Sequence, residues 1–265
     1  MLEIRNLSKS YADKEVLKDV SFTAVRGEIV SLLGANGSGK TTLFKAILNL
    51  TEHGGSVLFE GEPLSCEQCG FLPEERSLFY DCSVESQLRL FAGLKGLDRK
   101  KTAERIEYLS DKLRITSLLR ENPVILSKGN QQKVQLLIAL ISDPQVVILD
   151  EPWTGLDRNN AAIFEKILNE LKKQGKVIIL SSHQYQSVQS ICDHFLCLHN
   201  GILVIDVKRK ELEEREQRVL TVKTDRYLYI DEEGIESESR RKDEIRYVMK
   251  DEKSCWQLME KMKMI

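Results

Sequence analysis

The sequence predicts an α/β protein with a mostly parallel central sheet. Three apolar runs, EIVSLL (28–33), VVIL (146–149) and VIIL (177–180), have the composition of strands that are buried on both faces. Segments with helical periodicity, LFKAILNL (43–50) and AAIFEKILNELKKQ (161–174), stand after the first two of these runs. Strands that alternate with helices at this spacing are typical of a parallel sheet covered on both faces.

The other segments predict additions to this sheet. The β-rich stretches LEIRNL (2–7) and VSFTAV (20–25) predict an antiparallel portion at the N-terminus. Residues 80–143 carry helical patterns without good strand signals, so we expect an inserted helical subdomain there. We expect residues 1–205 to form one α/β domain. Of the 60 residues in 206–265, 31 are charged, which predicts a small, solvated α+β appendage.

Composition excludes several classes of protein. The 265 residues are 42% hydrophobic, with a net charge of -2, so the chain has no global field that would attract nucleic acid. Its apolar runs are far shorter than the roughly 20 residues that cross a bilayer. The N-terminal MLEIRNLSKSY lacks the layout of a secretory signal, and we expect a cytoplasmic protein.

Six cysteines are present, and two of them, Cys66 and Cys69, form a C-x-x-C. A metal or redox site is one interpretation of this pair. No second pair stands at the spacing of a zinc site, and reduced thiols are the default in a chain without an export signal, so a structural role is favoured.

The stretch GANGSGKT, Gly34 to Thr41, matches the pattern G-x-x-x-x-G-K-[ST] between an expected strand and an expected helix. The glycines allow backbone N–H groups to point at phosphate oxygens, and the helix adds about half a positive charge at its N-terminus. Lys40 can reach the β- and γ-phosphates, and the Thr41 hydroxyl can hold Mg²⁺. This pattern predicts a nucleoside triphosphate site.

Two further polar clusters follow apolar strands, where ligands gather in parallel sheets. VVILDEP delivers Asp150, which can orient Mg²⁺, and Glu151, which can take a proton from an attacking water. His183 follows KVIIL and two serines, and we expect it near the γ-phosphate. A structural role at a strand end is the alternative for each.

The stretch LSKGNQQKV (126–134) precedes the apolar run LLIALI. Ser127 is expected to cap a helix, and Gly129 allows the backbone to bend. Such a helix start can also donate hydrogen bonds to an anion. The residues alone leave open whether the stretch is only a cap or half of a site that a second chain completes.

The stretches GANGSGKTT, LSKGN, VVILDEPWTGLD and SSH occur in the order and approximate spacing of the ATP-binding subunits of ABC transporters. The chain resembles this family over residues 1 to about 205, and FLPEERSLF and LSKGNQQKV are most similar to a bacterial subgroup that exports ions, drugs or peptides. The resemblance implies a P-loop NTPase fold, ATP and Mg²⁺ as ligands, and a partner in the membrane.

Site residues follow from the same resemblance. Tyr11 matches the aromatic that stacks on adenine, with a core tyrosine as the alternative; Asp150 matches the metal-site aspartate and Glu151 the catalytic base. Asp157 matches the aspartate that links two subunits, and His183 the γ-phosphate switch. The residues that match the phosphate loop are Gly34, Asn36, Gly37, Ser38, Gly39, Lys40, Thr41 and Thr42.

The sequence departs from the family pattern at two places. Glu74 stands where the family usually has a glutamine that signals to the membrane partner, and it brings a negative charge near the phosphates. The second departure is in the signature, which is usually L-S-G-G-Q. This chain retains Ser127 and Gly129 but has Lys128 in place of the first glycine and Asn130 in place of the glutamine. The resemblance implies that these four residues face the ATP held by the opposite subunit.

We therefore expect an ATPase that forms a homodimer, or a heterodimer with a related chain, and energises an integral membrane permease. The family resemblance places it at the inner face of the cell membrane, and we expect no nucleic acid partner. One alternative is a soluble ABC-type ATPase that serves cofactor assembly or another role outside transport. Another is a regulatory module that binds nucleotide without turnover, against which Glu151 and His183 argue.

Overall fold

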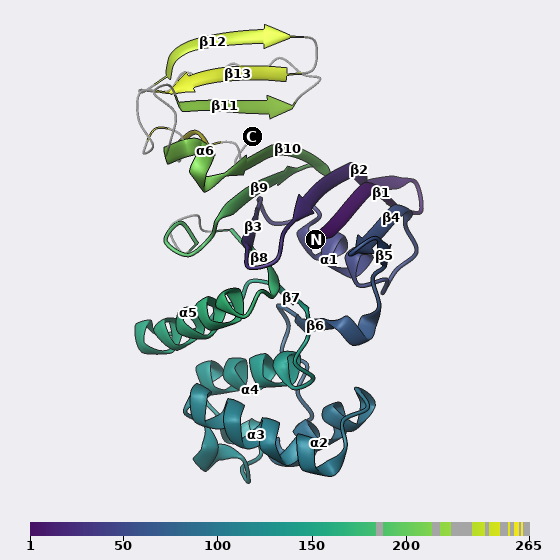
Figure 1. The fold of residues 1–265 in the computed structure, drawn as a ribbon, viewed down its shortest axis with the longest axis vertical. Coiled ribbons are helices and arrows are strands. Elements are labelled where there is room, and N and C mark those ends of the chain that lie inside the picture. The colour runs from purple at the N-terminus through teal and green to yellow at the C-terminus, as the bar shows by residue number, and fades with distance from the viewer. Residues whose placement is uncertain are drawn as a thin grey trace. The chain divides into compact units, whose positions relative to one another are not determined.

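The computed structural model describes residues 1–183, 188–213, 218–223, 235–241, 244–249, 254, 257–259 and 261. The chain forms two compact units (Figure 1). The first comprises residues 1–63 and 181–265, and the second comprises residues 64–180. The phosphate loop belongs to the first unit, whereas Asp150, Glu151 and the signature belong to the second.

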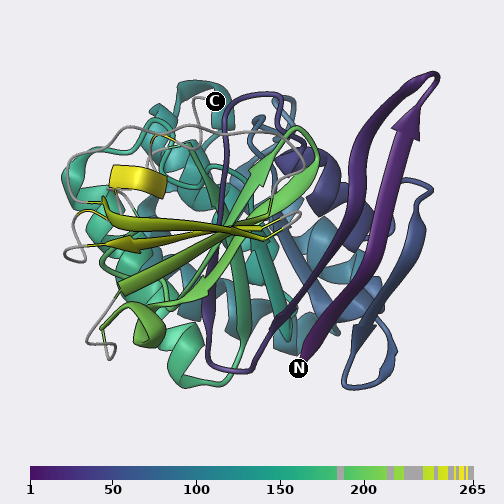
Figure 2. The ribbon, with the colours of Figure 1, turned by 90° about the horizontal axis from the view of Figure 1, so that it is seen from above.

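An antiparallel sheet opens the first unit, as predicted. Leu2, Ile4 and Leu7 are buried along its first strand, which matches the apolar–polar alternation of the N-terminal sequence. The first two strands form a long hairpin (Figure 2). In the order β2-β1-β4-β5, the sheet is built from β1 (Leu2–Tyr11), β2 (Lys14–Ala24), β4 (Gly54–Phe59) and β5 (Glu62–Pro63).

The phosphate loop of the first unit lies between a buried strand and a helix. All five residues of β3 (Ile29–Leu33) are buried, and six residues separate this strand from α1 (Lys40–Ile47). Strand β9 (His194–His199) pairs with β3 in parallel, and β10 (Ile202–Lys208) pairs with β9 antiparallel. The predicted order of strand, glycine-rich loop and helix is confirmed.

The second unit contains the other parallel strands. Strand β7 (Val146–Leu149) pairs in parallel with both β6 (Cys69–Leu72) and β8 (Val177–Ser182). Every residue of β7 is fully buried, and burying side chains of this size contributes about 1.5–3 kcal/mol each. Helix α5 (Arg158–Lys173) connects β7 to β8 and buries Phe164, among other residues, on its apolar face. The expected α/β class with a mostly parallel sheet is confirmed.

The helical subdomain of the second unit falls within the predicted residues 80–143. Its three longer helices lie side by side (Figure 1). They are α2 (Val84–Leu94), α3 (Arg99–Leu113) and α4 (Lys128–Leu140). Short 3₁₀ turns in this unit are η1 (Cys66–Gln68), η2 (Thr116–Leu118) and η3 (Pro123–Ile125). Within the described ranges, no helix combines the length and apolar character that a membrane span needs.

The C-terminal part contains a helix and strands, as its sequence texture predicts. Helix α6 (Arg209–Glu213) follows β10 directly. A separate antiparallel sheet, in the order β11-β13-β12, consists of β11 (Arg218–Lys223), β12 (Ile235–Arg241) and β13 (Glu244–Met249). Residues 224–230 of the expected strand VLTVKTDRYLYI lie outside the described residues. The expected domain boundary at 205/206 stays a prediction, and β10 runs across it.

Candidate active site

Close approach of the backbone explains the glycines of the phosphate loop. A Cβ at Gly34 would lie 2.5 Å from the Leu198 carbonyl oxygen and 2.5 Å from Ser38 Oγ, so no larger residue fits. Gly39 has φ +110, a conformation that residues with a side chain rarely adopt. The loop can therefore keep this shape only with glycine at these two positions.

The N-terminus of α1 is arranged to receive an anion. Gly39 occupies the cap position and offers no side chain to the N–H groups of the first turn, which carries no acidic residue. Lys40 is 7% exposed, and its Nζ donates to the Gly34 carbonyl at 2.8 Å and the Ala35 carbonyl at 3.2 Å. The lysine charge is thus held inside the loop whose N–H groups can bind phosphate.

Asp150 and Glu151 emerge from the end of β7. The Asp150 amide donates to the Leu72 carbonyl at 2.8 Å, which continues the pairing of β7 with β6 by one residue. Both acidic residues are buried, and Glu151 has φ +48, a left-handed conformation uncommon for a residue other than glycine. Backbone strain of this kind clusters at functional sites, where surrounding structure maintains it.

A short loop connects these two acids to α5. The Thr154 amide donates to the Glu151 carbonyl at 3.1 Å, and Asp157 ends the loop as the cap of α5. Asp157 Oδ1 accepts the Asn160 amide at 2.8 Å, and Oδ2 accepts Asn160 Nδ2 at 3.2 Å. Asp157 is exposed, and its carboxylate is held by these two hydrogen bonds to Asn160.

The signature forms the start of α4, as its sequence predicts. Ser127 is the cap, and its Oγ accepts the Asn130 amide at 3.3 Å. Ser127 and Lys128 are exposed, whereas Gly129 is buried, and a Cβ there would lie 2.8 Å from Asn160 Nδ2. The signature and the Asp157 loop are therefore packed together within the second unit.

Two glutamines that the motif analysis missed hold neighbouring loops against α4. Gln132 Nε2 donates to the Pro152 carbonyl at 3.3 Å, in the loop that follows Glu151. Gln135 Nε2 donates to the Glu75 carbonyl at 3.0 Å, one residue after Glu74. Both side chains are almost fully buried. Gln135 stands between the apolar residues Val134 and Leu136, which is a signal for a structural role, whereas Gln132 lies in the polar stretch of the signature and carries no such signal.

The remaining predicted site residues lie in the first unit. Tyr11 ends β1 and is 47% exposed, with Lys9 Nζ 4.8 Å above its ring, so the alternative of a core tyrosine is wrong. An aromatic ring exposed to this extent can stack on another ring. His183 follows β8 directly and is exposed, after the buried Ser181 and Ser182.

The C-x-x-C pair has a structural environment. Cys69 is buried at the start of β6, and its Sγ donates to the Ser65 carbonyl at 3.4 Å. Burial raises the pKa of the Cys69 thiol to about 11, so it stays protonated at neutral pH and is a poor metal ligand. In the part of the chain that the structure describes, no group of three histidine, cysteine or acidic residues is placed to hold a metal ion.

Together, the glycine loop at the N-terminus of α1 and the acidic strand end of β7 define a P-loop nucleotide-binding protein. The model of the ABC transporter family matches residues 17–154, more than half of the chain. The chain belongs to the ATP-binding proteins of ABC transporters. It binds and hydrolyses ATP and energises a transporter.

Two curated relatives illustrate the range of similarity. The chain is 41% identical over 201 residues to an uncharacterised ABC transporter ATP-binding protein of Methanocaldococcus jannaschii, covering 76% of this chain and 74% of the relative. It is 34% identical over 212 residues to the Nod factor export ATP-binding protein I of Sinorhizobium fredii, covering 77% of this chain and 62% of that protein.

Solved structures agree with the fold. An ATP-binding subunit of an ABC transporter matches with a TM-score of 0.75 and 33% identity, over 81% of this chain and 92% of that one. A dimeric bacterial ABC transporter cassette matches with a TM-score of 0.73 and 21% identity, over 78% of this chain and 98% of that one. The second likeness concerns the fold alone.

Proposed function

We propose that this chain is the ATPase subunit of an exporter, and that two ATPase subunits pair around ATP and drive an integral membrane permease from the inner face of the cell membrane. The partner is a second copy or a related chain. The observation that carries the pairing is the signature helix start, where Ser127 and Lys128 are exposed at an N-terminus suited to an anion. The export direction is supported by sequence similarity to the Nod factor export protein.

The phosphate-binding roles fall to the residues of the first unit. We assign Lys40 and the loop amides to the phosphates of ATP, Tyr11 to the adenine ring and His183 to the γ-phosphate. The full set that would surround the phosphates is Gly34, Asn36, Gly37, Ser38, Gly39, Lys40, Thr41 and Thr42.

Mg²⁺ fits the donors that the chain offers. The family resemblance assigns the ion to the Thr41 hydroxyl of the first unit and the Asp150 carboxylate of the second, and each is a hard oxygen ligand of the kind that Mg²⁺ prefers. The bound ion would neutralise charge on the transferred phosphoryl group. Asp150 is held for this role by its backbone bond to Leu72.

Glu151 is the proposed general base. It takes a proton from the attacking water as the water oxygen bonds to the γ-phosphorus and the bond to the oxygen of ADP breaks. The left-handed backbone of Glu151 and the Gln132 contact to the next residue, Pro152, fix where its carboxylate emerges. Asp157 is proposed to contact the other subunit, and Glu74 the region that responds to the permease.

An exposed apolar patch in the second unit supports docking of the permease. We define this patch as Phe79, Tyr80, Val124 and Ile125, whose exposed fractions range from 46% to 67%. Asn122 Nδ2 donates to the Tyr80 carbonyl at 2.8 Å, which joins the two segments that carry the patch. Exposed apolar clusters of this kind mark interaction surfaces, and this one begins five residues after Glu74.

Changing Glu151→Gln tests the hydrolytic role. We expect ATP turnover to fall by at least about a hundredfold, since loss of a general base typically costs that much. ATP binding and ATP-induced pairing should persist. Phosphate release and analytical ultracentrifugation measure the two properties, and turnover at the parent rate would remove Glu151 as the base.

Docking is tested by charging the apolar patch. The double variant Phe79→Glu, Ile125→Glu should lose co-purification with the permease, to be sought among multi-helix membrane proteins encoded beside this chain, while ATP binding is retained. Leu50→Glu is the matched control, because Leu50 is 63% exposed and lies in the first unit. Unchanged co-purification of the double variant would refute this docking surface, and a neighbouring set of cofactor-assembly genes would favour the soluble ATPase instead.

A further inference from the structure

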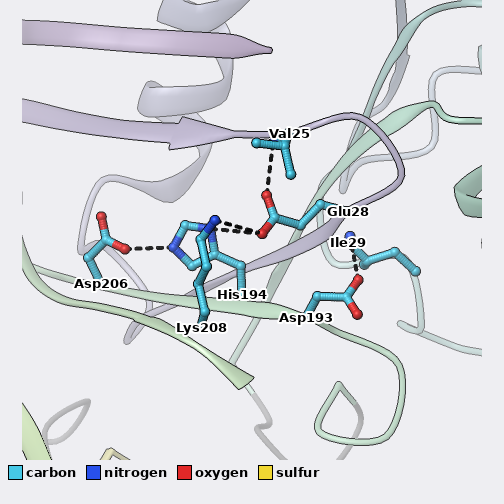
Figure 3. A network of polar contacts seen from close by, with 7 residues as sticks. All are labelled: Val25, Glu28, Ile29, Asp193, His194, Asp206 and Lys208. Atoms are coloured by element: carbon cyan, nitrogen blue, oxygen red, sulfur yellow. Dashed lines mark hydrogen bonds and ion pairs between the residues drawn. The ribbon is translucent and has the colours of Figure 1, made fainter. Parts of the chain in front are cut away.

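A buried histidine in the first unit lies between two carboxylates. His194 is the first residue of β9 and is 1% exposed. Its Nε2 lies 2.6 Å from Asp206 Oδ1, and its Nδ1 lies 3.8 Å from Glu28 Oε1 (Figure 3). Glu28 stands in the turn before β3 and is itself buried, whereas Asp206 projects from β10 toward solvent. The turn that carries Glu28, far away in the sequence, thus meets the two strands of the β9–β10 hairpin at this imidazole.

The arrangement favours a charged histidine. A neutral imidazole carries one N–H, which the 2.6 Å contact between Nε2 and Asp206 would take, whereas a protonated ring also directs positive charge at Glu28, from which Nδ1 is separated by 3.8 Å, too far for a hydrogen bond. The Lys208 Nζ lies 3.6 Å from Glu28 Oε1 and brings a second positive charge to the same carboxylate (Figure 3). The Asp193 carboxylate is engaged elsewhere, accepting the Ile29 amide at 3.0 Å. Two cations thus balance two anions.

The electrostatics agree with this arrangement. Burial lowers the pKa of His194, but the hydrogen bond to Asp206 and then the interaction with Glu28 outweigh burial and raise the pKa to about 9. Burial likewise raises the pKa of Glu28, but His194, the Val25 amide and Lys208 outweigh it, so that the pKa of Glu28 is lowered. Both shifts favour the charged forms of His194 and Glu28 at neutral pH.

The other end of the same hairpin supports the phosphate loop. β9 pairs with β3 so that His194 stands opposite Val30, and β10 turns back so that Lys208 stands opposite His194. At the far end, the Leu198 carbonyl abuts Gly34, and the Gly201 amide donates to the Ser38 carbonyl at 3.0 Å. A shift of the β9–β10 hairpin along β3 would therefore displace the Leu198 carbonyl and the Gly201 amide, which contact the phosphate loop.

We propose that the ionised His194, clamped between Glu28 and Asp206, is a positioning residue that fixes the β9–β10 hairpin against β3 and thereby holds the phosphate loop in its ATP-binding form. It acts through the hairpin and does not touch the nucleotide. The inference rests on the phosphate loop being the ATP site. Affinity for ATP should then depend on the charge of a histidine remote from the nucleotide.

The test is the pH profile of ATP affinity. Calorimetric titration of the full chain with Mg²⁺ and ATP from pH 6.5 to 9.5 should show constant affinity up to about pH 8 and a fall of about threefold to fourfold by pH 9.5, where a histidine with a pKa of about 9 keeps its proton in only about a quarter of the molecules. His194→Gln should bind more weakly at pH 7 and lose this pH dependence. His53→Gln, which removes a partly exposed histidine of the same unit that lies outside this cluster, is the control and should behave like the parent.

A milder variant keeps the test decisive if His194→Gln does not fold. Asp206→Asn removes one carboxylate at a half-exposed position and should move the fall in affinity to lower pH, while affinity at pH 6.5 stays near that of the parent. Parent and variants with one common pH profile would overturn the positioning role. Absence of ATP binding by the parent at every pH would instead contradict the assignment of the ATP site itself.

Discussion

Raising the pH should lower the free energy of unfolding of this protein, because the charged form of His194 stabilises the folded state. The pKa of His194 is raised from 6.5 to about 9 in the folded chain. A group whose folded pKa exceeds its unfolded pKa contributes stability that is complete below the unfolded value and disappears as the pH rises through the folded value. The window is therefore pH 6.5 to 9.

The size of the effect follows from the two pKa values. Their separation corresponds to about 3 kcal/mol of unfolding free energy, since each pKa unit is worth about 1.4 kcal/mol. No large discount for solvent applies, because the histidine side chain is only 2% exposed. A loss of this size is a substantial share of the roughly 5–15 kcal/mol that stabilises a typical domain.

Urea unfolding monitored by circular dichroism at pH 6.5, 8 and 9.5 measures the loss. The midpoint should fall by about 1 M over this range, given a urea dependence of about 1–3 kcal/mol per molar. Other groups titrate in the same window, so the informative quantity is the difference between the parent and His194→Gln. Equal pH dependence of the two proteins would refute the argument.

Two further predictions concern the second unit. Ser127→Ala should lower the free energy of unfolding by about 1 kcal/mol, because a helix cap is lost, and should reduce ATP turnover more than ATP binding. The control Ser83→Ala removes the cap of α2 and should cost similar stability while leaving turnover intact. An equal loss of turnover in both variants would contradict a role of Ser127 beyond capping. Gly70→Ala would place a Cβ 2.1 Å from the Ala139 carbonyl oxygen and should destabilise by about 1–3 kcal/mol or more in thermal unfolding, while Gly93→Ala, in open space on α2, should be neutral or stabilising.

Local physical requirements explain which parts of the fold could be predicted. The turn before α1 needs glycines that approach other backbone atoms closely, and these glycines stand within the eight consecutive residues GANGSGKT, where a sequence pattern can detect them. Strand β7 is buried on both faces and accordingly reads as an unbroken apolar run. The cap at Ser127 likewise needs only its own helix. Each signal lies within one short segment.

The His194 cluster could not be predicted in the same way. Glu28 and His194 are 166 positions apart, and neither residue belongs to a sequence motif that would predict their contact. The register of β9 against β3 and of β10 against β9 brings the charges together, and register depends on the whole sheet. The contacts of Gln132 and Gln135 are similar, because their carbonyl partners lie in loops whose paths the sequence does not specify.

The turn between β9 and β10 has a practical consequence for anyone who modifies this protein. A two-residue Asn-Gly turn at a hairpin tip is ordinarily a favoured place to insert an affinity tag or a fluorescent label. Here the Gly201 carbonyl accepts the Lys18 amide at 2.9 Å, and a Cβ at Gly201 would lie 2.1 Å from the Val16 carbonyl oxygen. An insertion at this turn would break its contacts both with β2 and with the phosphate loop. A tag or label should therefore be placed at another surface turn.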